Sequence, residues 1–272
     1  MGEAEANRRI AEWKQGTILN LSNLGLKSLQ IFTLPSTLTT LYCYNNQLTS
    51  LPTLPSTLTK LYCQNNQLTS LPTLPSTLTK LYCYNNQLTS LPTLVSTLTT
   101  LFCSSNQLTS LPTLPTTLTH LYCYNNQLTS IPTLVSTLTT LYCSSNQLTS
   151  LPTLPTTLIK LYCDNNQLTS LPTLVSTLRE LHCSSNQLTS LPTLVSTLIE
   201  LHYINNPFSF ETPRSDNETP HEYWNRLEVV QSRKRTIKRN RDIKEDLMMV
   251  SWHPSKVQKM LDLYGIDYED YV

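Results

Sequence analysis

Eight cysteines carry the most reactive side chains of this chain, and they stand twenty residues apart, at Cys43, Cys63, Cys83, Cys103, Cys123, Cys143, Cys163 and Cys183. Thiols can form disulfides, bind metal ions or act as nucleophiles, and each of these uses depends on spacing. A constant interval of twenty residues matches no disulfide framework and no zinc motif. The interval is therefore the phase of a repeat. We expect each cysteine to be a small buried apolar residue, in a reducing compartment, rather than a redox or metal site.

The repeat unit is twenty residues long and almost constant. Residues 71–90 read LPTLPSTLTKLYCYNNQLTS, and residues 51–70 differ from them only in having Gln64 where the later unit has Tyr84. Eight units carry the full pattern L-x-x-L-x-C-x-x-N-x-L, and the asparagine marks nine units, at Asn46, Asn66, Asn86, Asn106, Asn126, Asn146, Asn166, Asn186 and Asn206. Over residues 17–208 this pattern resembles the leucine-rich repeat, with cysteine in the third apolar position. The twenty-residue length and the Leu-Pro of LPTLP resemble the short repeats of bacterial effector proteins.

The alternation within Leu-Tyr-Cys predicts a short β-strand in each unit, with Leu81 and Cys83 pointing to one side and Tyr82 to the other. Parallel strands stacked at ~4.8 Å would share one core. We expect the asparagine to bond backbone groups in its turn, and the proline-containing PTLPST segment to form an extended or irregular convex side. The predicted fold is a leucine-rich repeat solenoid of the α/β class, mainly parallel β. Its core would hold the residues equivalent to Leu78, Leu81, Cys83, Leu88, Leu91 and Leu94.

Three domains follow from the limits of the repeat. Residues 1–16 are predicted to form an N-terminal cap helix that buries Ile10 and Trp13. Residues 17–208 form the solenoid, with about ten coils, and residues 209–272 form a C-terminal helical extension or cap. In that extension, Thr219-Pro220-His221-Glu222 has the sequence of a capping box. The stretch EDLMMVSWHPSKVQKML resembles C-terminal segments of proteins from giant DNA viruses of amoebae, which implies a viral protein that meets host proteins inside the cell.

The outward positions around each cysteine predict a tyrosine-rich concave face that binds a protein partner. Tyrosine offers a large contact area, few torsions and a polar tip, which suit a binding surface. The alternative is that these rings form an aromatic ladder that stabilises neighbouring strands without any ligand. The residues that we predict to contact a partner are Tyr42, Tyr62, Tyr82, Phe102, Tyr122, Tyr142, Tyr162, His182, Tyr84, Tyr124, Lys60, Lys80 and Lys160.

Less specific sequence patterns indicate other possible functions. Regular threonine pairs such as Thr57 and Thr59 are typical of ice-binding solenoids, although Ile159 and Arg179 interrupt them. The basic segment SRKRTIKRNR could attach nucleic acid or direct nuclear import through Arg233, Lys234 and Arg235. Its alternative is a solvated helix that caps the last repeat. A structural or virion protein without a specific ligand is a further alternative to the binding scaffold.

The sequence lacks the motifs of the common catalytic sites. Four glycines, at positions 2, 16, 25 and 265, cannot supply a glycine-rich phosphate loop, and the five histidines form no HExxH-like set. The bacterial effector repeats often precede a ubiquitin ligase domain with a catalytic cysteine, but no cysteine follows Cys183. The start MGEAEANRRI lacks the apolar segment of a secretory signal, and no apolar run is long enough to span a bilayer. We therefore predict a non-catalytic cytoplasmic scaffold for protein–protein interaction, without cofactor or metal.

Overall fold

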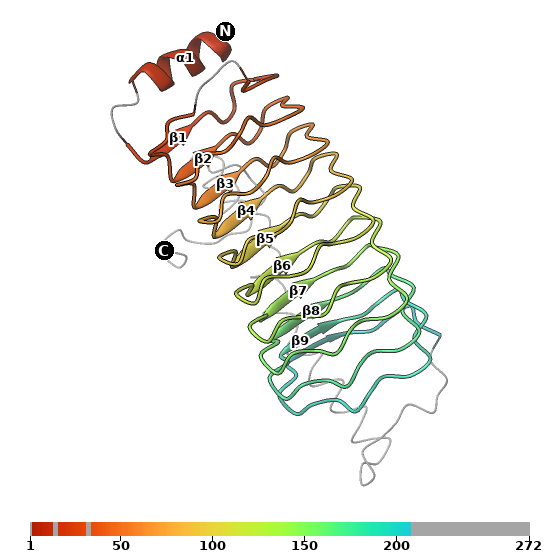
Figure 1. Cartoon of the computed structure of the whole chain (residues 1–272). Helices are drawn as coiled ribbons and strands as arrows, with labels where there is room; N and C mark the ends of the chain where they lie inside the picture. The colour runs from red at the N-terminus through yellow and green to blue at the C-terminus, as the bar shows by residue number, and fades with distance from the viewer. Residues whose placement is uncertain (1, 13–15, 31–33, 208–272) are drawn as a thin grey trace, which may run out of the picture. The chain divides into compact units, whose positions relative to one another are not determined.

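The chain folds into a stack of short parallel strands that begins with one helix (Figure 1). The computed structural model describes residues 2–12, 16–30 and 34–207. Helix α1 spans Gly2–Glu12, and the strands form one sheet in the order of the sequence. The strands are β1 (Ile18–Asn20), β2 (Thr40–Tyr42), β3 (Lys60–Tyr62), β4 (Lys80–Tyr82), β5 (Thr100–Phe102), β6 (His120–Tyr122), β7 (Thr140–Tyr142), β8 (Lys160–Tyr162), β9 (Glu180–His182) and β10 (Glu200–His202).

The register of the sheet copies the period of the sequence. Strand β4 pairs in parallel with β5, so that Leu81 lies opposite Leu101 and Tyr82 opposite Phe102. Each strand is three residues long and ends before the cysteine, one residue earlier than Leu-Tyr-Cys predicts. The pairing nevertheless continues, because the Cys83 amide donates a hydrogen bond of 2.8 Å to the Phe102 carbonyl.

The predicted core is confirmed except at one position. Leu78, Leu81, Cys83 and Leu88 are fully buried, and all eight cysteines are buried and free. The exception is Leu91, which is half-buried. Its equivalents are buried in some turns and half-buried in others, so this position lies at the edge of the core. The fully buried positions sit on the strand and at the two turns that flank it, where neighbouring coils enclose each side chain.

The repeat asparagine bonds backbone groups of its own turn, as predicted, and also connects that turn to the preceding one. The Asn86 side-chain amide donates hydrogen bonds to the Cys63 carbonyl at 3.1 Å and to the Cys83 carbonyl at 3.0 Å. Its Oδ1 accepts a hydrogen bond of 3.0 Å from the Leu68 amide in the preceding turn. One side chain thus satisfies backbone groups that lie between strands and would otherwise be buried without partners.

The residue before this asparagine has a left-handed backbone in every turn. Its φ is 54° at Asn85 and 52° at Ser105. Asparagine tolerates this region better than most residues, which explains why the turns need no glycine. The first asparagines also form an amide ladder, in which each Nδ2 donates to the preceding Oδ1: Asn45 to Asn23 at 3.0 Å, Asn65 to Asn45 at 2.6 Å, and Asn85 to Asn65 at 2.7 Å.

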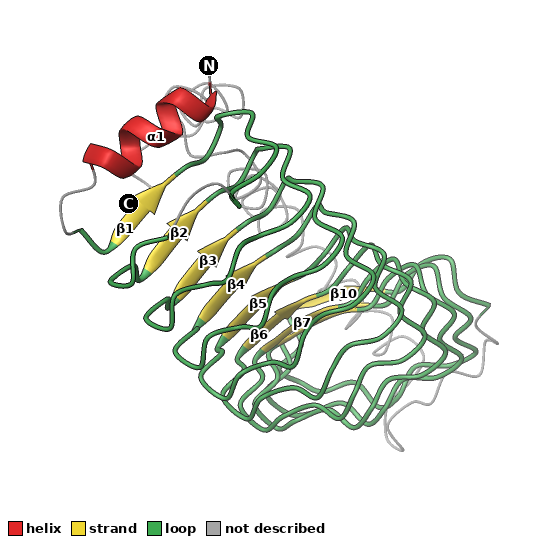
Figure 2. Ribbon diagram, turned by 45° about the horizontal axis from the view of Figure 1, so that its top comes forward, coloured by secondary structure: helices red, strands yellow, loops and turns green. Residues whose placement is uncertain are grey.

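The convex side is irregular, as the prolines predict, and no helix occurs on it within residues 34–207 (Figure 2). The paired threonines have a structural role there. The Thr57 hydroxyl lies 2.7 Å from the Ser36 carbonyl and 2.8 Å from the Leu38 carbonyl, and the Thr59 hydroxyl donates to the Thr39 carbonyl at 3.0 Å. These hydroxyls bond carbonyls of the neighbouring turn, which gives the repeated threonines a role in holding the turns together.

The N-terminal helix is confirmed, whereas the C-terminal predictions lie outside the described residues. Ala6 of α1 is fully buried, Ile10 is half-buried, and Arg9 donates a hydrogen bond of 3.0 Å to the Asn20 carbonyl of β1. Trp13 is not among the described residues, and neither are the capping box, the basic segment and the virus-like stretch. In the described part of the chain, no helix has the length and apolar character that crossing a bilayer requires.

Candidate binding surface

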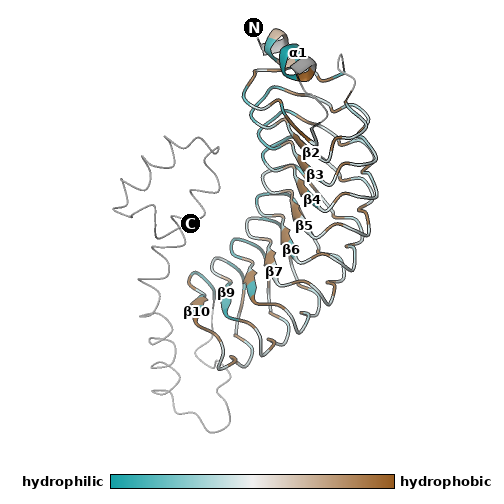
Figure 3. Ribbon diagram, turned by 90° about the vertical axis from the view of Figure 1, so that its left-hand side faces the viewer, coloured by the Kyte–Doolittle hydropathy of each residue, from teal (hydrophilic) through white to brown (hydrophobic). Residues whose placement is uncertain are grey.

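Three columns of outward side chains cover the strand side of the stack, which Figure 3 shows on the inner side of the bend and which we call the concave face. The aromatic column consists of Tyr42, Tyr62, Tyr82, Phe102, Tyr122, Tyr142, Tyr162, His182 and His202. The charged column begins two residues earlier in each turn and consists of Thr40, Lys60, Lys80, Thr100, His120, Thr140, Lys160, Glu180 and Glu200. The third column follows the cysteines and consists of Tyr44, Gln64, Tyr84, Ser104, Tyr124, Ser144, Asp164, Ser184 and Ile204.

The rings of the aromatic column stack on one another. Ring centroids are 4.6 Å apart between Tyr42 and Tyr62, and again between Tyr62 and Tyr82, with interplanar angles of 21° and 18°. Phe102 and Tyr122 lie 3.9 Å apart and almost parallel, at 7°. The aromatic ladder between neighbouring strands, which was the alternative interpretation of these residues, is therefore present. It covers the ring faces from Tyr42 to Tyr122, whereas Tyr122 and Tyr142 meet edge to face, with centroids 4.7 Å apart and an interplanar angle of 65°.

Burial changes along the aromatic column. The rings from Tyr42 to Tyr122 are half-buried, whereas Tyr142, Tyr162 and His182 are buried. Burial, reinforced by the neighbouring tyrosines, raises the pKa of Tyr62 to about 12 and also raises the pKa of Tyr82. These phenols therefore stay protonated at neutral pH and can donate hydrogen bonds.

The lysines of the charged column differ in their surroundings. Lys160 Nζ lies 3.2 Å from Glu180 Oε1, which neutralises much of its charge. Lys60 and Lys80 lie side by side in register on β3 and β4. Burial lowers the pKa of His120, and the ammonium groups of Lys80 and Lys160 lower it further. The column therefore has a positive potential that favours the neutral form of this imidazole.

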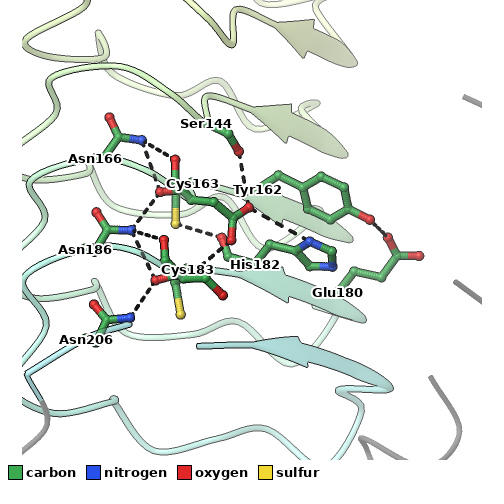
Figure 4. A network of polar contacts seen from close by, with 11 residues as sticks. Ser144, Tyr162, Cys163, Asn166, Glu180, His182, Cys183, Asn186 and Asn206 are labelled. Atoms are coloured by element: carbon green, nitrogen blue, oxygen red, sulfur yellow. Dashed lines mark hydrogen bonds and ion pairs between the residues drawn. The ribbon is translucent and has the colours of Figure 1, made fainter. Parts of the chain in front are cut away.

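A polar network occupies the C-terminal end of the concave face (Figure 4). Asp164 accepts hydrogen bonds from the Ser184 amide at 2.9 Å and from the Ser144 hydroxyl at 3.3 Å. Its Oδ2 lies 3.9 Å from His182 Nδ1. The Tyr162 hydroxyl donates to the Glu180 carboxylate. Acidic and imidazole groups thus replace the lysines and tyrosines of the earlier turns.

Histidines at this end come close enough to raise the question of a metal. The ligand atoms of His182, Glu200 and His202 all lie within 4.8 Å of one another. The two histidine rings are stacked, however, with centroids 3.9 Å apart and an interplanar angle of 10°. The nitrogen lone pairs lie in the ring planes, so those of stacked imidazoles run parallel and do not converge on one ion. This geometry does not by itself form a metal site.

Two buried polar atoms in the third column have no hydrogen-bond partner among the described residues, namely Gln64 Oε1 and Ser104 Oγ. Gln64 occupies the position that Tyr44 has in the preceding turn and Tyr84 in the following one. It is the one residue in which the units 51–70 and 71–90 differ. Unpaired buried acceptors cost free energy. These atoms show that the third column is less completely satisfied than the asparagine and threonine positions.

Strand alternation predicted which residues share the concave face, but not the interactions between them. All thirteen predicted contact residues lie on the concave face, in three columns that strand alternation brings together. The pairs of Asp164 with His182 and of Lys160 with Glu180 were not predicted. Their signal was available, since each pair joins ionisable side chains of neighbouring turns, 18 or 20 residues apart in a twenty-residue repeat.

Comparison with known families bears on the same repeats. The family profile for leucine-rich repeats in two copies matches residues 56–96, 96–136 and 116–156. This chain is a leucine-rich repeat protein. Comparison of the leucine-rich repeat protein with curated proteins found no match.

Solved structures place this leucine-rich repeat protein near bacterial effector domains. YopM from Yersinia enterocolitica is 36% identical with a TM-score of 0.65, over 68% of this chain and 41% of that one. YopM from Yersinia pestis, a leucine-rich effector protein, is 36% identical with a TM-score of 0.69, over 76% of this chain and 66% of that one. InlJ from Listeria monocytogenes, whose functional domain includes a cysteine ladder, is 32% identical with a TM-score of 0.62, over 71% and 45%. The chain thus spans less than half of the first of these structures.

Proposed function

We propose that this leucine-rich repeat protein is a non-catalytic scaffold that binds a protein partner on its concave face. The observation that carries the proposal is the aromatic column with its flanking lysines. Its rings from Tyr42 to Tyr122 stay half-exposed although they stack. Stacking holds each ring in place before a partner arrives, so little side-chain freedom is lost on binding.

The comparisons support the general class of this function. Leucine-rich repeat domains are generally non-catalytic, and the similar Yersinia pestis protein is a leucine-rich effector. Effector resemblance favours a host protein as partner, in the interior of a host cell. The eight free, buried thiols fit a reducing cytoplasm. An origin in a giant virus of amoebae and nuclear import through Arg233, Lys234 and Arg235 remain predictions from residues 209–272.

Affinity capture from host-like cell lysate, followed by mass spectrometry, tests this proposal. One variant replaces Tyr82, Tyr122, Tyr142 and Tyr162 with serine. A second variant replaces the same four residues with phenylalanine, which keeps the stack and removes only the hydroxyl groups. The matched control replaces four exposed glutamines with alanine: Gln67, Gln107, Gln127 and Gln167.

Proteins that are retained by the native chain and the glutamine control but lost by the serine variant would support binding on the concave face. Circular dichroism must show that the serine variant remains folded. If a folded serine variant retains the same proteins, the binding site lies elsewhere on the chain. If neither the native chain nor the serine variant captures a protein, a structural role without a specific ligand becomes the better explanation.

A further inference from the structure

The charges of the solenoid are distributed very unevenly. No acidic residue occurs between Glu12 and Asp164, and the only residues between 34 and 159 that carry a formal charge at pH 7 are Lys60 and Lys80. Both belong to the charged column of the concave face, on adjacent strands. The other outward surfaces of these turns consist of neutral side chains. The concave face therefore has a concentrated positive charge over β3 and β4.

This arrangement has a cost within the protein itself. Like charges directly opposite one another on neighbouring strands destabilise a sheet. Lys60 and Lys80 are register partners, and no acidic residue follows them before Asp164, four turns after Lys80. Threonine occupies the same position in β2 and β5, so the fold does not require lysine there. An anionic ligand would remove this repulsion.

The neighbouring aromatic column presents hydrogen-bond donors to the same ligand. The face of Tyr62 is covered by Tyr42 and Tyr82, each with its centroid 4.6 Å away. The edges of aromatic rings carry partial positive charge, and the phenol tips can donate hydrogen bonds. Since burial raises the pKa of Tyr62 to about 12, this hydroxyl stays protonated at neutral pH. Ammonium groups and hydroxyl donors therefore lie together, as carboxylate recognition requires.

The covered ring faces also distinguish between kinds of anionic partner. Proteins that bind single-stranded nucleic acid without sequence preference stack bases on open aromatic faces. From Tyr42 to Tyr122 the faces between successive rings are occupied by stacking, with centroid separations of 3.9 to 4.6 Å, and Tyr122 and Tyr142 meet edge to face at 65°. Carboxylate side chains need only donors and positive charge, which the edges, hydroxyls and lysines supply.

We propose that the concave face over β3 and β4 binds an acidic polypeptide segment, whose carboxylates contact Lys60, Lys80 and the tyrosine hydroxyls. This inference rests on the proposed function and names the chemistry of the partner. Lys160 contributes less, because Glu180 already pairs with it at 3.2 Å. The acidic residues Asp164 and Glu180 mark the end of the favourable region and orient the segment away from the C-terminal turns.

The test uses the full chain and a fluorescein-labelled decapeptide of alternating glutamate and serine, with fluorescence anisotropy as the readout. The double variant Lys60→Gln, Lys80→Gln removes two positive charges from the concave face. The control Lys27→Gln, Arg179→Gln removes two positive charges from exposed positions outside the three columns. We expect the first variant to bind about fivefold or more weakly than the native chain, and the control to bind within about twofold of it. Lys160→Gln should weaken binding less than either Lys60→Gln or Lys80→Gln.

Two comparison probes complete the experiment: a decapeptide of alternating lysine and serine, and a ten-nucleotide oligouridine. The acidic peptide should bind more tightly than both, and its affinity should fall as salt rises. Equal affinity for the acidic peptide in the native chain and the Lys60, Lys80 variant would overturn the inference. Tighter binding of oligouridine or of the basic peptide would overturn it too.

Failure of this inference can be separated from failure of the proposed function. The Lys60, Lys80 variant is included in the lysate capture beside the tyrosine variants. One outcome is a partner that is lost by the tyrosine-to-serine variant and is still captured by the Lys60, Lys80 variant. This result would keep the concave face as the binding site and exclude an acidic segment over β3 and β4. Partners that all variants retain would contradict both statements.

Discussion

Asn126 and Leu108 lie in successive turns and are joined by a hydrogen bond of 3.0 Å from the Leu108 amide to Asn126 Oδ1. The same side chain donates to the carbonyls of Cys103 and Cys123, each at 3.1 Å. All three bonds are buried, and those to Leu108 and Cys103 cross from one coil to the next. The repeat asparagine therefore holds the turns together as directly as the strand ladder does.

Replacing Asn126 with alanine should reduce the free energy of unfolding by about 2–4 kcal/mol, because it leaves several buried backbone groups without partners. Urea denaturation measures this change. The control is Gln127→Ala in the same turn, whose side chain is exposed and whose loss should change stability by less than about 0.5 kcal/mol. Equal effects of the two substitutions would mean that the asparagine bonds contribute nothing.

Leu121 and Tyr122 are neighbours on β6 that face opposite sides of the sheet. Leu121 is fully buried, so Leu121→Ala should cost about 2–5 kcal/mol. Tyr122 is half-exposed and stacks on Phe102 at 3.9 Å, so Tyr122→Ala should cost nearer ~1 kcal/mol. Thermal melts of both variants check the difference. Equal losses would show that the assignment of inward and outward residues is wrong.

Ser105 interrupts the asparagine ladder while keeping its left-handed backbone, with φ at 52°. We expect Ser105→Asn to stabilise the protein by about 0.5–1 kcal/mol, because asparagine tolerates this backbone better and its amide can bond Asn85. The control is Ser110→Asn, at an exposed position without positive φ. Chemical denaturation should show no gain for the control, and no gain at Ser105 would contradict the ladder as a source of stability.

The buried thiols make the fold sensitive to alkali. Burial raises the pKa of Cys43 and of Cys103 to about 12, and it also raises the pKa of Cys63 and of Cys123. A thiol that stays neutral in the folded chain but ionises in the unfolded chain favours unfolding as pH rises above its unfolded value. This contribution to stability is therefore complete below about pH 8.5 and should fall by up to about 1.4 kcal/mol per thiol for each further pH unit, until the folded pKa is reached.

Urea denaturation at pH 7, 9 and 10 measures this dependence. Replacing Cys63, Cys83, Cys103 and Cys123 with alanine should reduce the pH slope, although it lowers stability at pH 7. A slope that does not change in this variant would show that the thiols are not its cause. Alkylation by iodoacetamide gives an independent readout, since the buried thiols should react only when the chain unfolds.

The architecture could be predicted from the periodicity of the sequence, because one local rule repeats along the chain. Alternation around Leu81 and Cys83 predicts which side chains enter the core, and the period of twenty predicts which residues become register partners. The role of the asparagine follows from its chemistry, since a short amide beside a turn can reach backbone groups. Duplication of the unit made each prediction hold many times, so the concave face and its residues could be identified before the structure.

Interactions between these residues depend on how neighbouring turns pack. Whether Tyr62 and Tyr82 present faces or edges depends on ring torsions, which packing between adjacent turns selects. Leu91 lies half outside the core because its burial depends on how the convex segments of neighbouring turns close over it. Asp164 and His182, like Lys160 and Glu180, approach only when their strands are in register. Periodicity states which residues share a face, but the distances and angles between side chains arise from packing that no single unit contains.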